Sequence, residues 1–272
     1  MQTIDLEKAL DTRMLAMEAN IAATGTKLDA ANMLLGQLKT PAFAASDSFT
    51  RPANATPYAA NKSMNCNVSV TALAYTLKVV TLTANNAFAV GDRITVAGCN
   101  TGFTVTNVDG NWICKTGTNA TTVVFDVLVQ PTGTTPQTIT VGTIAKCLSL
   151  DVAGVVGGGV IISRITVSLP GVGMTGAIRL YPYKAQPTVL VDQATFTLLA
   201  ANDPNRLDYI DLYPITEGAG SDGTFASKQM WEVFKCDPTE TRIYFRLASE
   251  GAGTPASAGV ATLRASGIQL LG

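Results

Sequence analysis

Short runs of β-branched and aromatic residues fill the chain from Ser46 to the C-terminus, and this pattern restricts the fold more than any other feature. Glycine, asparagine, aspartate and proline separate the runs, which are Leu77–Thr83, Arg93–Val96, Phe103–Thr106, Thr121–Val129, Thr138–Val141, Val160–Val167, Ala177–Tyr181 and Arg242–Leu247. Such residues favour β-strands, and short strands at this spacing are typical of sandwiches, jelly rolls and barrels. No run alternates with a long helical pattern, so a nucleotide-binding parallel sheet is not supported.

Residues 1–40 differ from the rest because they carry a heptad pattern. One series recurs every seven residues, and a second series is offset from it by four: Leu10, Met17, Thr24, Ala31 and Leu38, then Met14, Ile21, Leu28 and Leu35. The pattern predicts a helical segment that self-associates or docks on another protein, with candidate contact residues Leu10, Met14, Met17, Ile21, Leu28, Leu35 and Leu38. The alternative is a helix folded back onto its own domain. A break at Thr24-Gly25-Thr26 is as consistent with the pattern as a single rod, and Pro41 ends the region.

A change of composition inside the β region indicates an insertion. Residues 68–146 are rich in threonine, valine and asparagine, whereas the flanking regions hold most of the tyrosines. We therefore expect an inserted small β domain over 68–146 in a body made of residues 41–67 plus 147–272. Cys66 and Cys147 flank the insertion, so a disulfide across its neck is one hypothesis. Buried free thiols are the other, because cysteine packs as a small hydrophobe and disulfides are rare in the cytoplasm.

The composition excludes several classes of function. The chain has no histidine in 272 residues, which removes Ser-His-Asp and Cys-His catalysis and histidine-ligated metals. A net charge of −1 gives no overall field that would attract nucleic acid or an acidic membrane. No targeting segment or membrane span is predicted. We expect no catalytic residues, no cofactor and no metal. An enzyme is the alternative, using Asp208, Asp211, Glu217 or Glu232, but no two of these carboxylates are placed by the sequence across a cleft.

Two sets of side chains leave alternatives open. The aromatic set predicts core packing, with a sugar-binding platform as the alternative: Tyr181, Tyr183, Tyr209, Tyr213, Trp231, Phe234, Tyr244 and Phe245. The arginine set alternates with apolar residues, which fits either a solvated strand face or a protein interface: Arg179, Arg242, Arg246 and Arg264.

Several motifs resemble a family of virion structural proteins of tailed bacteriophages. They are Ser48–Ala60 (SFTRPANATPYAA), Gly157–Ile162, Ile178–Tyr183, Gln186–Thr188, Asp192–Phe196 and Tyr209–Asp211. Apart from the insertion, the resemblance extends from about Ser46 to Gly272, and Asn61-Lys62-Ser63 departs from the family's more usual Gly-Asp-Val. The resemblance implies a jelly-roll decoration, or cement, protein on the outside of the capsid. Its partners would be the major capsid protein and copies of itself, as a trimer rather than a dimer.

The insertion resembles a small β module of phage tail and surface proteins, through Ala89–Gly98 and Gly102–Thr106. A Val-Gly-Asp turn between two alternating runs suits a β-hairpin. The resulting expectation is a mainly β virion protein that is made in the host cytoplasm and located on the capsid surface, with the insertion projecting outward. The alternative is a tail or head fibre protein whose inserted module binds host surface glycans.

Overall fold

The computed structural model divides into two compact units, Met1–Pro41 and Ala42–Gly272. It describes residues 12–27, 42–52, 57–100, 108–133, 135–170, 174, 176–198, 200–216, 223–253 and 258–270. In the first unit, residues 12–27 form one helix that continues through Thr24-Gly25-Thr26, so the alternative of a break there is wrong. The hydroxyls of Thr24 and Thr26 donate to the carbonyls four residues earlier, which keeps both threonines within the helix. No helix of the described residues is long and apolar enough to cross a membrane.

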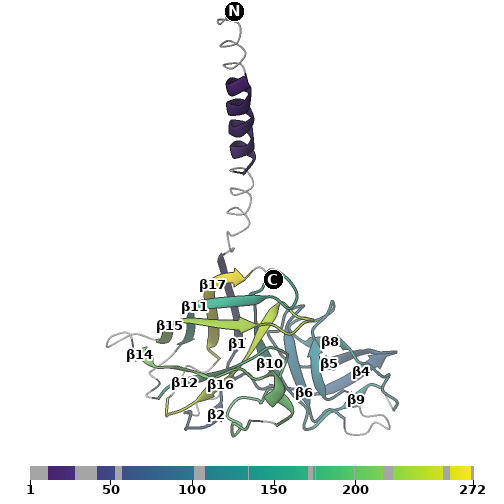
Figure 1. Cartoon of the computed structure of the whole chain (residues 1–272). Helices are drawn as coiled ribbons and strands as arrows, with labels where there is room; N and C mark the ends of the chain where they lie inside the picture. Colours follow the sequence, from purple (N-terminus) through teal and green to yellow (C-terminus); the bar gives the residue numbers. More distant parts are fainter. Residues whose placement is uncertain are drawn as a thin grey trace, which may run out of the picture. The chain divides into compact units, whose positions relative to one another are not determined.

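The second unit is a β-sandwich body with an insertion (Figure 1). A five-stranded sheet has the order β1-β17-β11-β15-β14, and the larger sheet begins β13-β12-β16-β10. The bounds are β1 Ala42–Thr50, β10 Thr143–Asp151, β11 Gly159–Pro170, β12 Ile178–Tyr183, β13 Ile210–Leu212, β14 Pro214–Thr216, β15 Gly223–Lys235, β16 Arg242–Ser249 and β17 Val260–Leu270. The prediction of a mainly β chain with an N-terminal helix and a sandwich body is confirmed.

The strand pairing identifies the sandwich as a jelly roll. Four antiparallel pairs are nested in the sequence: β1 with β17, β10 with β16, β11 with β15, and β12 with β13. The further antiparallel pairs β11–β17 and β12–β16 join these four pairs into two sheets. This nesting is what a long hairpin gives when it is rolled up into two sheets, the defining arrangement of a jelly roll. The inward side chains of β11, from Val160 to Leu169, are fully or almost fully buried between the sheets. One continuous apolar core therefore stabilises both sheets.

The insertion lies between β1 and β10 and shares a sheet with the body. Its strands β6 (Arg93–Ala97), β7 (Gly110–Ile113) and β3 (Val68–Ser69) extend the larger sheet, with β6 paired to the first half of β10. A separate four-stranded sheet lies beside them in Figure 1, formed by β4 (Ala72–Thr76), β5 (Val79–Thr83), β8 (Thr122–Asp126) and β9 (Gln137–Thr138). The short β2 (Lys62–Ser63) pairs with β16.

The expected boundary between residues 146 and 147 has no counterpart in the fold, so residues 68–146 are not a separate unit. Strand β10 passes through that point without interruption and pairs with β6 on one side of it and with β16 on the other. Lys146 also ties the insertion to the body, because its ammonium group lies 2.7 Å from Asp47 of β1 and 3.0 Å from Asp92 of the insertion. Burial lowers the pKa of Lys146, but the two carboxylates outweigh this effect and raise it above its usual value.

Candidate interaction surface

The outer side of the sheet β13-β12-β16-β10 is covered by residues 184–198 and 200–209. We name this side the covered face. Beneath the covering segment lies a second apolar cluster, formed by Ala145, Cys147, Tyr181, Tyr183, Val189, Tyr244 and Ala248. The segment is fixed at both ends of the sheet: Phe196 donates its backbone N–H to Asn61, and Val189 donates its own to the hydroxyl of Thr95 on β6. A 3-10 helix, Ala200–Asn205, lies within the segment.

Cations and aromatic rings alternate across the covered face. Arg246 lies over the ring of Phe196 at 4.5 Å, and that ring stacks on Tyr181 at 4.7 Å. Tyr181 contacts Tyr209, over which Arg179 lies at 4.4 Å. Such cation–π and stacked contacts add to the free energy gained by burying the rings. Arg179 donates two hydrogen bonds to Asp211, at 2.6 and 3.0 Å, and forms an ion pair with Glu250 at 3.3 Å, so its position is fixed.

A second cluster joins two motifs that lie far apart in the sequence, Ser48–Ala60 and Asp192–Phe196. The hydroxyl of Tyr58 donates to the carboxylate of Asp192 and accepts from Arg51 Nε at 3.0 Å. Arg51 Nε also lies 3.5 Å from the same carboxylate, and all three side chains are buried. Burial raises the pKa of the Tyr58 hydroxyl, and that of the Asp192 carboxyl, above their usual values. The most distinctive residues of the sequence resemblance therefore stabilise the fold and are inaccessible to a partner.

The outer side of the five-stranded sheet has a different character. We name it the open face, and it consists of the outward side chains of β1, β17, β11 and β15. Strand register places them in cross-strand rows: Ala42, Ile268, Ile161 and Val233; Ala44, Ser266, Arg164 and Gln229; Ser46, Arg264, Thr166 and Ser227; Ser48, Thr262, Ser168 and Phe225. Most of these side chains are small, one row is wholly apolar, and the only charges in the rows belong to Arg164 and Arg264.

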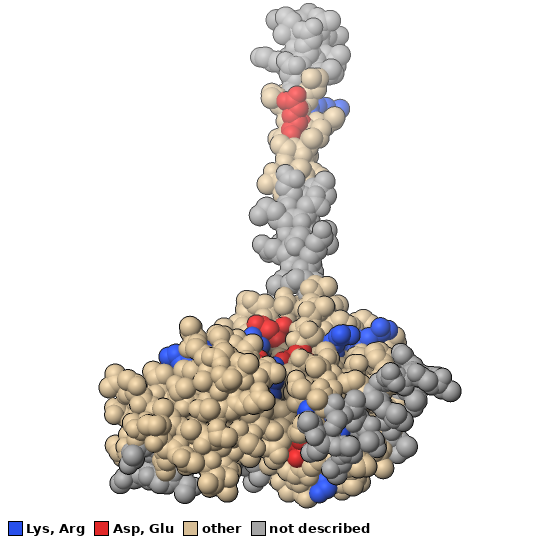
Figure 2. Space-filling view, turned by 180° about the vertical axis from the view of Figure 1, so that it is seen from behind, with Lys and Arg blue, Asp and Glu red and all other residues tan. Residues whose placement is uncertain are grey.

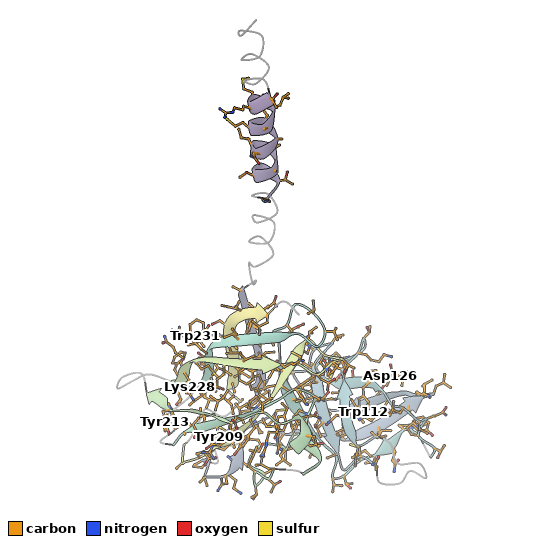
Figure 3. The ribbon with its side chains drawn as sticks, viewed as in Figure 1. Trp112, Asp126, Tyr209, Tyr213, Lys228 and Trp231 are labelled. Carbon is orange, nitrogen blue, oxygen red and sulfur yellow. The ribbon has the colours of Figure 1, made fainter. Side chains whose placement is uncertain are left out.

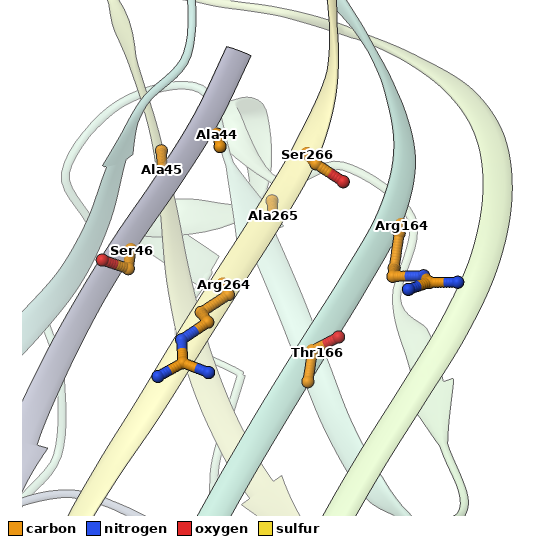
Figure 4. A pocket seen from close by; sticks show the side chains of 8 residues that line it. All are labelled: Ala44, Ala45, Ser46, Arg164, Thr166, Arg264, Ala265 and Ser266. Carbon is orange, nitrogen blue, oxygen red and sulfur yellow. The ribbon is translucent and has the colours of Figure 1, made fainter.

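The two arginines flank a hollow of about 340 Å³ in the open face, which has a floor of small side chains (Figure 4). Neither arginine has an acidic partner among the described residues. A second hollow joins Arg164 to Trp231. A β-bulge in β15 opposite Ser163 lies at Trp231, whose side chain is 72 % exposed. Exposed tryptophan and unpaired arginine are the residue types most enriched in the energetic centres of protein interfaces.

Further exposed aromatic residues continue this surface around the edge of the sandwich. Tyr209 and Tyr213 border a hollow that also includes Asp211, Ser227 and Lys228. Figure 3 shows Trp231, Lys228, Tyr213 and Tyr209 along one side of the body, with Trp112 and Asp126 on the other. Charged side chains are sparse on the body surface visible in Figure 2. The cross-strand rows of the open face hold only two charged residues, Arg164 and Arg264, so binding there would depend mainly on apolar and hydrogen-bonding contacts.

The cysteines do not form the disulfide that was one hypothesis for the neck of the insertion. All five are free and buried. Cys66 belongs to the core between the sheets, whereas Cys147 belongs to the cluster on the covered face, so the sheet separates their thiols. Burial raises the pKa of Cys66 to about 12 and that of Cys147 above its usual value. The alternative of buried thiols is the one that the structure supports.

The candidate contact residues of the N-terminal segment are only partly described. Met14, Met17 and Ile21 lie on the helix 12–27 and are exposed. Leu10, Leu28, Leu35 and Leu38 lie outside the described residues.

The aromatic set divides between core and surface. Core packing was correct for Tyr181, Tyr183, Phe234, Tyr244 and Phe245, and wrong for Tyr209, Tyr213 and Trp231. The arginine set divides too, since Arg246 is buried, Arg179 and Arg242 pair with carboxylates, and Arg264 is exposed.

The four carboxylates considered for an enzyme have different surroundings. Asp211 pairs with Arg179, Asp208 is exposed, Glu232 is exposed on β15, and Glu217 lies outside the described residues. The described residues contain no group of three or more cysteine, aspartate or glutamate side chains arranged to hold a metal ion. A scan against protein-family models finds no match, and a search of curated proteins finds no significant relative.

Proposed function

We propose that this chain is a non-enzymatic structural protein of a tailed-bacteriophage particle, which decorates and stabilises the capsid exterior as a symmetric homo-oligomer. The observation that carries the proposal is the open face: a whole jelly-roll sheet surface with small side chains, an apolar row, unpaired arginines and an exposed tryptophan. Its partners would be the major capsid protein and further copies of the chain, with a trimer favoured over a dimer. The motif resemblance and the jelly-roll topology point in the same direction.

The physical basis of such adhesion is the close approach that a flat sheet surface permits. Alanine, serine and threonine side chains let a partner contact the sheet over a large area, and a stable interface needs about 800 Å² on each side. Trp231 and the arginines would provide the anchoring contacts. Each contact is modest by itself, but a symmetric oligomer that engages several capsid subunits at once binds far more tightly through its high effective concentration.

The alternative of a glycan-binding fibre protein has less support from the insertion. Sugar-binding platforms use exposed aromatic rings, but Trp112 stacks on the buried Phe125 and donates its indole N–H to Val108. The large apolar side chains exposed on the described part of the insertion are aliphatic, for example Leu77 and Leu128. The exposed Trp231, Tyr209 and Tyr213 lie on the body, on the side away from Trp112 of the insertion (Figure 3).

A co-sedimentation experiment tests the proposal. Full-length chain is mixed with capsids that lack it, from the virus whose genome encodes it, and the bound fraction is measured after pelleting. We expect saturable binding by the wild type, at least tenfold weaker binding by Trp231→Ala, and unchanged binding by Leu128→Ala, an exposed apolar residue of the insertion. Failure of the wild type to bind capsids would overturn the proposal. Equal binding by Trp231→Ala and the wild type would show that Trp231 of the open face does not contribute to capsid binding.

A further inference from the structure

The helix 12–27 has an apolar stripe that no described residue of its own unit covers. Every residue of this helix is exposed. Met14, Met17 and Ile21 are spaced three and four residues apart, so they lie on one side of the helix, and each is more than half exposed. In the heptad notation of coiled coils, Met14 and Ile21 occupy position a and Met17 occupies position d. A stripe of this width is the seam of a coiled coil rather than the broader face of a helix packed in a globular core.

The charges beside the stripe identify what covers it. Arg13 and Lys27 occupy position g on one flank, and Glu18 occupies position e on the other. Arg13 and Glu18 have no ion-pair partner among the described residues. A helix with one basic flank and one acidic flank is complementary to a copy of itself that runs in the same direction.

Chain direction decides whether these flanks attract or repel. In a parallel, in-register coiled coil, position g of one helix faces position e of the next heptad of its neighbour, which places Arg13 opposite Glu18 of the other copy. In an antiparallel pair, position g faces position g, so the basic flank with Arg13 and Lys27 would meet itself. Like charges in such positions select against that arrangement.

We infer that residues 12–27 are a self-association site whose occupant is the same helix of further copies, arranged parallel and in register. This inference rests on the proposed homo-oligomer and specifies how its subunits are joined. Parallel association brings the N-terminal segments of all subunits together with the same chain direction. Such an arrangement fits a closed, cyclic assembly, in which every subunit presents the same face to a shell.

Disulfide trapping tests the inference on the full-length chain. Parallel, in-register packing places each seam residue next to its own copy, within the reach of a disulfide. Met14→Cys and Ile21→Cys, tested separately, should therefore each give covalently linked chains under mild oxidation. Ala19→Cys, on the opposite side of the helix, should remain uncrosslinked. The five native cysteines are buried, so the wild type serves as the blank.

Charge reversal provides the second measurement. Glu18→Arg should place like charges opposite each other and lower the yield of the crosslinked Ile21→Cys chain, whereas adding Arg13→Glu should restore it. An antiparallel pair can link Ile21→Cys or Met14→Cys to its own copy, but not both at the same register. Crosslinking of only one of the two variants would therefore overturn the inference. So would the absence of crosslinks in both variants.

The two proposals can fail separately. If the chain binds capsids as an oligomer while neither cysteine variant crosslinks, the inference is wrong and the proposed function stands. If both variants crosslink while the wild type does not bind capsids, the proposed function is wrong and the parallel helix association stands.

Discussion

The two outer faces of the jelly roll differ in what covers them. The covered face lies beneath residues 184–198 and 200–209, and its tyrosines and arginines form stacked and hydrogen-bonded contacts with these residues. The open face carries mostly small side chains, with two arginines and an exposed tryptophan that have no such cover among the described residues. A segment of the same chain thus covers one sheet, whereas the other sheet exposes the residue types that are enriched at protein interfaces.

This difference shows why recognisable motifs and functional surface need not coincide. Arg51, Tyr58 and Asp192 belong to the motifs that carry the family resemblance, yet they are buried in one cluster. Trp231 belongs to none of those motifs, yet it is the most prominent side chain of the open face. These motif residues therefore contribute to the jelly-roll fold, whereas the side chains available to a partner lie on the open face.

The largest expected contrast is between an aromatic residue of each face. Tyr181→Ala removes a buried ring that stacks on Phe196, so we expect it to lower the free energy of unfolding by about 3 kcal/mol. Trp231→Ala should change it by less than about 0.5 kcal/mol, because the exposed indole contributes little to the fold. Urea unfolding measures both. A large loss of stability in Trp231→Ala would show that this residue serves the fold and would weaken the comparison.

A hydroxyl deletion sharpens the comparison with a smaller effect. Tyr58→Phe keeps the ring but leaves Arg51 and Asp192 without their shared hydrogen-bonding partner, so we expect a loss of about 2 kcal/mol. Tyr213→Phe, at the exposed edge of the body, is the matched control and should be nearly neutral. The free energies of unfolding come from the same urea titrations. Equal stability of the two variants would mean that the buried cluster is not a stabilising device.

The sequence predicted the class of the fold because that information is local. Runs of β-branched residues separated by turn formers lead directly to short strands, and the heptad spacing leads directly to the helix. The nested pairing of β1 with β17 is not local, since the two strands lie at opposite ends of the body. The jelly roll therefore came from the resemblance rather than from the residues themselves.

The errors arose where tertiary contacts decide the outcome. The composition changes near Lys146, but β10 continues through this point because it pairs with β6 on one side of it and with β16 on the other. The alternating pattern of the strand predicts Trp231 as a core residue. A β-bulge beside it changes which side chains face inward, and Trp231 is exposed. The alternating pattern predicts Arg246 at a surface, but it is buried, with its guanidinium over the ring of Phe196 and donating to the carbonyl of Thr197. No feature of the single sequence contains these pairings.

The pH dependence of stability should also distinguish the buried cluster. The pKa of Asp192 is raised in the folded state by burial, against the lowering effects of Tyr58, the Asn65 N–H and Arg51. The folded state therefore binds this proton more tightly than the unfolded state does. Its contribution to stability is fully present below the unfolded pKa and is lost as the pH rises through the folded pKa. Asp192→Asn lacks this titration.

Unfolding titrations from pH 4 to pH 8 measure this effect, because the difference in stability between the wild type and Asp192→Asn should shrink as the pH rises, by at most about 1.4 kcal/mol per pH unit. A difference that grows with pH would mean that Arg51 and the hydrogen-bond donors outweigh burial.

The smallest expected effect is the reaction of the native thiols, which should be undetectable. Burial raises the pKa of Cys66, Cys99 and Cys114 to about 12 and that of Cys236 to about 11. Since the thiolate is the reactive form, few of these sulfurs are nucleophilic at pH 8, and the fold also blocks access to them. A thiol reagent should therefore label no cysteine in the native protein and all five in denaturant. Only three reactive thiols in denaturant would mean that one pair is oxidised. If that pair were Cys66 and Cys147, the side chains assigned to the core between the sheets and to the covered face would have to meet, and the separation of the two faces would need revision.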